Sequence, residues 1–66
     1  MNYKLNTNLI KLQMLQKGYS INRLSKESHI SKSTISRMLN QEGTSRPETI
    51  YKIATALDLE VKDLLI

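Results

Sequence analysis

The sequence contains no cysteine and a single histidine, His29. Disulfide bonds and thiolate metal sites are therefore excluded, and one imidazole cannot supply the cluster of nitrogen ligands that a zinc site requires. We expect no metal and no other cofactor. A chain without cysteine suits a reducing compartment, so the sequence predicts a cytoplasmic location.

No run of apolar residues is longer than three, so the sequence predicts no membrane-spanning helix and no apolar core of a signal peptide. Trp and Phe are absent, and Gly and Pro are scarce. A glycine-rich phosphate loop, a catalytic triad and metal-ligand spacings are absent too. Glu60 and Asp63 could share one helix face, but two carboxylates on a short helix are usually solvated, and we do not expect an enzyme.

The 66 residues suffice for a single domain over 1–66 with a small core and a thin margin of stability. Since disulfides and metals are excluded, dimerisation or a regular helical core is the remaining way to reinforce so small a fold.

Acidic residues are scarce in the first two-thirds of the chain. Residues 1–41 hold seven Lys or Arg and one acid, Glu27, whereas residues 42–66 hold three Lys or Arg and five acids. This division predicts that the first part meets a polyanion and that the last part does not. Charge alone fits DNA, RNA and an anionic membrane surface equally well.

The stretch 31–39 predicts a short two-faced helix. Ser31 is a good N-cap, because its hydroxyl can accept a hydrogen bond from a first-turn N–H. Ile35, Met38 and Leu39 follow at helical spacing and form an apolar stripe. The opposite face carries only donors and cations: Lys32, Ser33, Ser36 and Arg37. Such a face suits the phosphates and guanine edges of duplex DNA, although it could also be a merely solvated face.

Four further helices and no strand are expected around this helix. A first helix, capped by one of Asn6, Thr7 and Asn8, runs to about residue 17, and the others cover about 21–28, 47–57 and 61–65. Residues 1–5 are expected to form a flexible arm, and residues 40–46, which contain no apolar side chain, a loop. His29 lies in the turn 28–30, where it could titrate but is expected to be simply exposed.

The span from about Leu9 to Leu65 resembles the phage repressor/Cro family of helix-turn-helix DNA-binding domains, the XRE type. The resemblance is carried by segments in the family's order: Lys17-Gly18-Tyr19-Ser20, Leu24, 30–37, 48–50, 52–54, Ala56-Leu57 and 61–64. It implies an all-α, compact five-helix fold with the helix-turn-helix at about 20–39. The helix after Ser31 is then the recognition helix in the major groove.

By position, the resemblance implies base reading by Lys32, Ser33, Ser36 and Arg37. It implies phosphate contacts by Ser20, Arg23, Ser31, Thr34, Asn40, Thr44, Ser45 and Arg46. Physical chemistry supports this division, because Lys and Arg can pair with guanine O6 and N7, whereas hydroxyls and helix N-termini hold phosphates.

The departures from the family pattern are also informative. Ile21 stands where the family usually has a phosphate-binding glutamine, and Glu60 is a poorer cap than the usual Ser or Asp, so we expect the last helix to fray. Many members bury an arginine–glutamate pair at the positions of Met14 and Leu39. Both charges are absent together here, which avoids the roughly 3–5 kcal/mol cost of a lone buried charge. We expect Met14 and Leu39 to touch across the core.

The leading hypothesis is a sequence-specific DNA-binding transcriptional regulator, a repressor that binds a pseudo-palindromic operator in double-stranded DNA as a homodimer. Its half-sites would lie about 34 Å apart. The dimer contact is expected at the C-terminal apolar residues Leu59, Leu64, Leu65 and Ile66, which could instead only close the monomer core. Two alternatives stay open: a protein-interaction module such as an antitoxin or regulatory subunit, and the DNA-binding head of a longer regulator.

Overall fold

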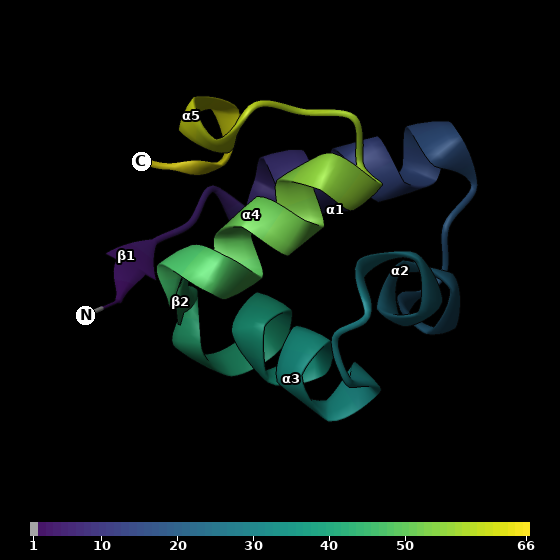
Figure 1. Cartoon of the computed structure of the whole chain (residues 1–66), viewed down its shortest axis with the longest axis horizontal. Coiled ribbons are helices and arrows are strands. Elements are labelled where there is room, and N and C mark those ends of the chain that lie inside the picture. The colour runs from purple at the N-terminus through teal and green to yellow at the C-terminus, as the bar shows by residue number, and fades with distance from the viewer. Residues whose placement is uncertain (1) are drawn as a thin grey trace.

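The computed structural model describes residues 2–66, apart from the side chain of Glu42. The elements are β1 (Tyr3–Lys4), α1 (Thr7–Lys17), α2 (Ile21–Ser28), α3 (Lys32–Arg37), the π-helix η1 (Met38–Glu42), β2 (Thr44–Ser45), α4 (Pro47–Ala56) and α5 (Val61–Leu64). Figure 1 shows α4 at the centre, with α3 at one end of the domain and α5 at the opposite end. The expected compact five-helix architecture is confirmed.

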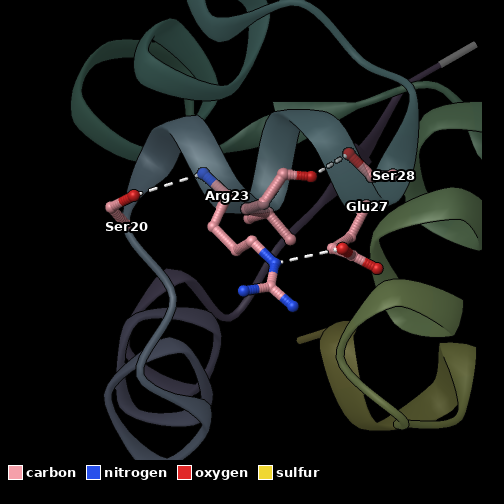
Figure 2. Close-up of polar contacts among 5 residues, drawn as sticks. Ser20, Arg23, Glu27 and Ser28 are labelled. Atoms are coloured by element: carbon pink, nitrogen blue, oxygen red, sulfur yellow. Dashed lines mark hydrogen bonds and ion pairs between the residues drawn. The ribbon is translucent and has the colours of Figure 1, made fainter.

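Local chemistry explains where α1 and α2 begin and where α1 ends. Asn6 Oδ1 accepts a hydrogen bond from the N–H of Leu9, and Ser20 Oγ accepts one from the N–H of Arg23 (Figure 2), each at 3.2 Å. Gly18 ends α1 with a φ of 70°, a left-handed conformation that glycine adopts without a Cβ clash. These boundaries are those that the sequence predicts.

The core is filled by branched aliphatic side chains from all five α-helices. The most deeply buried are Ile10, Leu24, Ile35, Ile50, Ile53, Leu57 and Leu64. Met14 and Leu39 are also buried, at 7% and 8% exposure, and belong to the same apolar cluster. Met14 and Leu39 are therefore buried in the core, as expected, while a direct contact between their side chains stays a prediction.

Two serines allow α2 to pack closely within the helix-turn-helix. Ser28 is 3% exposed, and its hydroxyl donates to the carbonyl of Leu24 at 2.6 Å (Figure 2). Ser25 donates to the carbonyl of Ile30, which fixes the turn that leads into α3. Both of these hydroxyls are therefore satisfied by a backbone acceptor, as burial requires.

The flexible arm expected over residues 1–5 is wrong for Tyr3 to Leu5, and so is the expectation of no strand; Met1 lies outside the described residues. β1 pairs antiparallel with β2, with Tyr3 opposite Ser45. Leu5 is 3% exposed, and its N–H donates to the carbonyl of Gly43 at 2.8 Å. Because Leu5 belongs to the core, the backbone beside it is held against the α3–α4 connection.

The loop expected over residues 40–46 is also wrong. Residues 38–42 continue α3 as the π-helix η1, which keeps Met38 and Leu39 buried. Gly43 ends this turn with a φ of 65°, and its N–H donates to the carbonyl of Met38 at 3.0 Å. The wider turn thus carries α3 into β2 without a loose loop.

Fraying of the last helix is opposed by Asp63, whose carboxylate accepts a hydrogen bond from the N–H of Glu60 at 3.2 Å. This is one half of a capping box, and it holds the backbone where the helix begins. A carboxylate expected only to be solvated therefore has a local structural role.

Candidate nucleic-acid interface

The α3 helix presents a polar face to solvent. Ile35 anchors it with no exposed surface, while Lys32, Ser33 and Arg37 are exposed and Ser36 is half-buried. The expected base-reading side chains therefore lie on one short helix, whose opposite side packs against the core. Cations and hydroxyls placed in this way can donate hydrogen bonds to the acceptor-rich edges of a DNA groove.

Ser31 serves mainly to start this helix. Its hydroxyl accepts a hydrogen bond from the N–H of Thr34 at 3.2 Å and donates to Thr34 Oγ1 at 2.8 Å. Since the Thr34 oxygen accepts that bond, the proton of its own hydroxyl stays available for another acceptor. Thr34 is thus better placed than Ser31 to donate to a phosphate.

The start of α2 holds Ser20 and Arg23, both exposed. Arg23 Nε donates to Glu27 Oε2 at 3.0 Å (Figure 2), and the guanidinium carbon lies 5.0 Å from the ring centre of Tyr19. Two neighbours therefore fix the direction of this cation. In Figure 2 only Nε is bonded to Glu27, and the terminal nitrogens keep donor capacity for a phosphate.

A second group of polar side chains lines a hollow of about 200 Å³ beside α3. This group comprises Asn2, Thr34, Arg37, Thr44, Ser45, Arg46 and Thr49, and the apolar side chain of Met38 completes the lining. The hollow brings Arg37, a residue expected to read bases, next to four residues expected to contact phosphates. Ser45 is the least accessible of these, with 9% exposure. These residues together form the polar hollow.

Asn2 and Thr49 are members of the polar hollow that the sequence did not single out. Thr49 lies within the segment 48–50 that resembles the family pattern, but no role was expected for it. Asn2 falls in the expected arm, and its position depends on the pairing of β1 with β2. No local sequence pattern predicts that β1 pairs with β2, because the two segments are far apart in the chain.

The expected phosphate contacts divide into two groups on either side of α3. Thr44, Ser45 and Arg46 lie at the polar hollow, on and after β2. Asn40 instead lines a separate, mainly apolar hollow of about 340 Å³ together with Tyr19 and Ile21, next to the start of α2. In Figure 1, α3 lies between α2 and β2. A groove-binding helix flanked by phosphate-binding groups has this arrangement.

The apolar residues at the C-terminal end do not form one exposed surface. Leu64 has no exposed surface, so its expected dimer contact is wrong: the side chain fills the monomer core and cannot reach a partner. Leu59 and Leu65 are half-buried against the core, and Ile66 is 78% exposed. Leu65 also lines an apolar hollow of about 290 Å³ with Tyr3, Pro47, Ile50 and Val61.

No helix in residues 2–66 is both long and apolar enough to span a membrane. Within the same residues, His, Asp and Glu side chains form no group of three or more that could hold a metal ion.

Comparison with known proteins identifies similar domains. A family model described as the Cro/C1-type HTH DNA-binding domain matches residues 9–66. Among solved structures, the fold is similar to the crystal structure of SinR, the master regulator for biofilm formation, in complex with DNA. The TM-score is 0.78 at 26% sequence identity, and the match covers 85% of this chain and 90% of that chain. Comparison with curated proteins gives no match.

Proposed function

Because this chain belongs to the Cro/C1-type helix-turn-helix DNA-binding family, we propose that it is a sequence-specific regulator of transcription. In this proposal α3 enters the major groove. Lys32, Ser33, Ser36 and Arg37 read base edges there, and residues on both sides of α3 hold the backbone phosphates.

One observation supports this proposal: the exposed polar face of α3 is flanked by separate groups of side chains that can donate hydrogen bonds to phosphates. Ser20, Arg23 and Asn40 lie on the α2 side, and Thr44 to Arg46 lie on the β2 side. A solvated helix face would explain the exposure of α3 alone. It would not explain why further donors and cations border that face on two sides.

The regulator would act as a repressor by occupying a pseudo-palindromic operator as a homodimer. The described part of the chain measures 29 × 22 × 18 Å, so two adjacent copies could present their recognition helices about 34 Å apart, one turn of DNA. The likeness to SinR, a regulator seen in complex with DNA, supports a regulatory role.

The test is selection of bound duplexes from a random DNA pool at low and at near-physiological salt. We expect a two-fold-symmetric motif that survives the higher salt. A lone half-site would indicate a monomer or the head of a longer regulator. If binding is lost at the higher salt and no motif is enriched, the basic face attracts DNA only by non-specific electrostatics, which would contradict the proposal.

Two matched variants separate the recognition of DNA bases from non-specific electrostatic attraction to DNA. Lys32→Ala removes a cation from α3, whereas Lys62→Ala removes an exposed cation from α5, at the opposite end of the domain. Both changes lower the net charge equally. We expect only Lys32→Ala to change the selected motif.

A second candidate function is binding to a protein partner, as in an antitoxin or regulatory subunit. The observation that favours it is the exposure of Leu12 and Leu15 on α1, at 52% and 79%. A stable hetero-complex on purification, together with a failed DNA selection, would put this candidate first.

A further inference from the structure

The polar hollow is assembled from four separate parts of the chain. Thr34 and Arg37 come from α3, Thr44 and Arg46 from β2 and the residue after it, and Thr49 from the first turns of α4. Asn2 comes from the N-terminal segment. Because Tyr3 lies opposite Ser45 in an antiparallel pair, the chain before Tyr3 continues alongside Arg46. The strand pairing therefore sets Asn2 at the edge of the hollow.

The N-terminal segment is anchored firmly enough to act as part of this surface. The N–H of Leu5 donates to the carbonyl of Gly43 at 2.8 Å, and the N–H of Asn6 donates to the carbonyl of Leu64 at 2.7 Å. Leu5 itself is buried. Asn2 is thus only a few residues from a fixed point, which limits the entropy lost when it binds a ligand.

The lining of the hollow has the chemistry of an anion site. Among the described residues, it combines the cations Arg37 and Arg46 with hydroxyl and amide donors and includes no acid. Glu48, which precedes Thr49, is paired with Lys52 at 3.1 Å. Within the described residues, the side chains of Asn2, Arg46 and Thr49 make no hydrogen bond or ion pair. Their donors are therefore available to an external acceptor.

The size and position of the hollow favour a phosphate in a nucleic-acid backbone. Its volume of about 200 Å³ is roughly that of six or seven water molecules in the liquid, which suits one phosphate group with some hydration. Arg37 belongs both to the reading face of α3 and to this hollow. A duplex lying on α3 would therefore bring a phosphate to it.

We propose that the polar hollow binds one backbone phosphate of duplex DNA and that Asn2 and Thr49 are ligands of this phosphate. The proposal rests on the DNA-binding function proposed above and extends the DNA-contacting surface to β1 and α4. In this proposal, the pairing of β1 with β2 positions Asn2 as a ligand of the phosphate. The segment is then part of the binding site.

The test uses the full chain with Thr49→Val and Asn2→Ala, each of which removes a donor. We expect each variant to weaken binding to the selected duplex by about three- to tenfold, the loss typical of one hydrogen bond. A phosphate contact carries no sequence information, so the same factor is expected on a random-sequence duplex. Thr55→Val, an exposed threonine on the same helix, and Asn8→Ala, an exposed asparagine on α1, are the matched controls and should bind as the wild type does.

Replacing single phosphates by uncharged methylphosphonates identifies which phosphate the hollow binds. In a series of duplexes that each carry one such replacement, we expect the wild type to bind more weakly when the replacement stands at that phosphate. On that duplex we expect Thr49→Val to cause no further loss. Equal losses on every duplex of the series would show that the variant acts through the fold and would overturn the proposal.

Failure of this proposal is distinguishable from failure of the proposed function. If the wild type selects a motif and both variants bind it normally, the phosphate site is wrong and the regulatory function stands. If no motif is selected but both variants still weaken binding to the random-sequence duplex, the phosphate site stands without sequence reading.

Discussion

Lys17 Nζ lies 2.6 Å from Asp58 Oδ2, and this ion pair joins the end of α1 to the turn that follows α4. Lys17 also lies 5.5 Å from the ring centre of Tyr19, the ring that Arg23 approaches from α2. The pair thus begins a chain of polar and ring contacts that links three helices. Asp58 itself has a φ of 57°, a left-handed conformation that Asp tolerates better than most residues.

The ion pair predicts a small pH-dependent contribution to stability. The hydrogen bond to Asp58 raises the pKa of Lys17 above its ordinary value of 10.5. Because the folded state holds this proton more tightly, the contribution is complete below pH 10.5 and is lost as the pH rises through the raised pKa. We expect Asp58→Asn to lower the Tm slightly at pH 7 and to have a smaller effect as the pH rises through the raised pKa of Lys17. Thermal unfolding followed by circular dichroism at low salt measures this difference.

Lys17→Met provides the control for that pair. In the Lys17→Met background, Asp58→Asn should leave the Tm unchanged at pH 7, since the partner is already absent. An equal loss in both backgrounds would mean that the effect comes from the turn conformation of Asp58.

Leu5 predicts a large effect of a residue close to the N-terminus. Truncating a buried leucine removes apolar contacts and leaves a cavity, so Leu5→Ala should lower the free energy of unfolding by roughly 2–5 kcal/mol. Leu15→Ala, at a position 79% exposed, should change it by about 0.5 kcal/mol or less. Urea unfolding of both variants makes the comparison. Similar values for the two would show that the N-terminal strand is detached in solution.

The helices could be predicted from the sequence because their ends depend on adjacent residues. Asn6, Ser20 and Ser31 each cap the helix that follows, and Gly18 supplies the left-handed turn that ends α1. Each of these signals lies within a few residues of the backbone group that it satisfies. Pattern and spacing were therefore enough for the helix-turn-helix and for the exposed face of α3.

The features that were missed depend on partners distant in the sequence. The strands β1 and β2 have two residues each, too few to show an alternating pattern. Leu64 was expected at a dimer contact because α5, with four residues, is too short for periodicity to tell its inward side from its outward side. Asn2 was missed at the polar hollow because its place follows from the undetected strand.

His29 predicts a gain in stability from a glycine. It ends α2 with a φ of 60°, and its N–H donates to the carbonyl of Ser25. A left-handed conformation costs a residue with a Cβ about 1–2 kcal/mol. Glycine avoids this cost but loses more backbone entropy on folding, so its net advantage is smaller. We expect His29→Gly to be more stable than His29→Ala by about 1 kcal/mol. Urea unfolding tests the order of the two variants, and the reverse order would mean that the turn relaxes out of this conformation.

Arg37 and Arg23 predict two different ways of losing DNA affinity. Arg37→Ala should cost about 1–3 kcal/mol and relax the preference at one base position, because Arg37 lies on the face of α3 that we propose to read bases. Arg23→Ala should weaken binding equally on all sequences and reduce the salt slope by about one. Binding to the selected duplex and to its single-base variants at several salt concentrations separates these outcomes. A uniform loss for Arg37→Ala would assign Arg37 to the phosphates only.

The corrected C-terminal surface predicts where the two copies of the proposed dimer would meet on DNA. With Leu64 in the core, the accessible apolar residues at this end are Tyr3, Val61, Leu65 and Ile66, around one hollow and the chain end. Val61 and Ile66 are 37% and 78% exposed, so Val61→Glu and Ile66→Glu should leave the monomer folded. A charge buried in the dimer contact should weaken dimerisation roughly tenfold or more.

Binding to a whole operator and to an isolated half-site separates dimerisation from DNA reading. Because α5 and α3 lie at opposite ends of the domain in Figure 1, Val61→Glu and Ile66→Glu should retain the affinity of the wild type for the half-site. On the whole operator they should lose cooperativity, which sedimentation of the complexes would show as a shift from two bound copies to one. Leu15→Glu places the same charge on an exposed leucine of α1 and should behave as the wild type does. Unchanged cooperativity in both C-terminal variants would exclude this surface as the dimer contact.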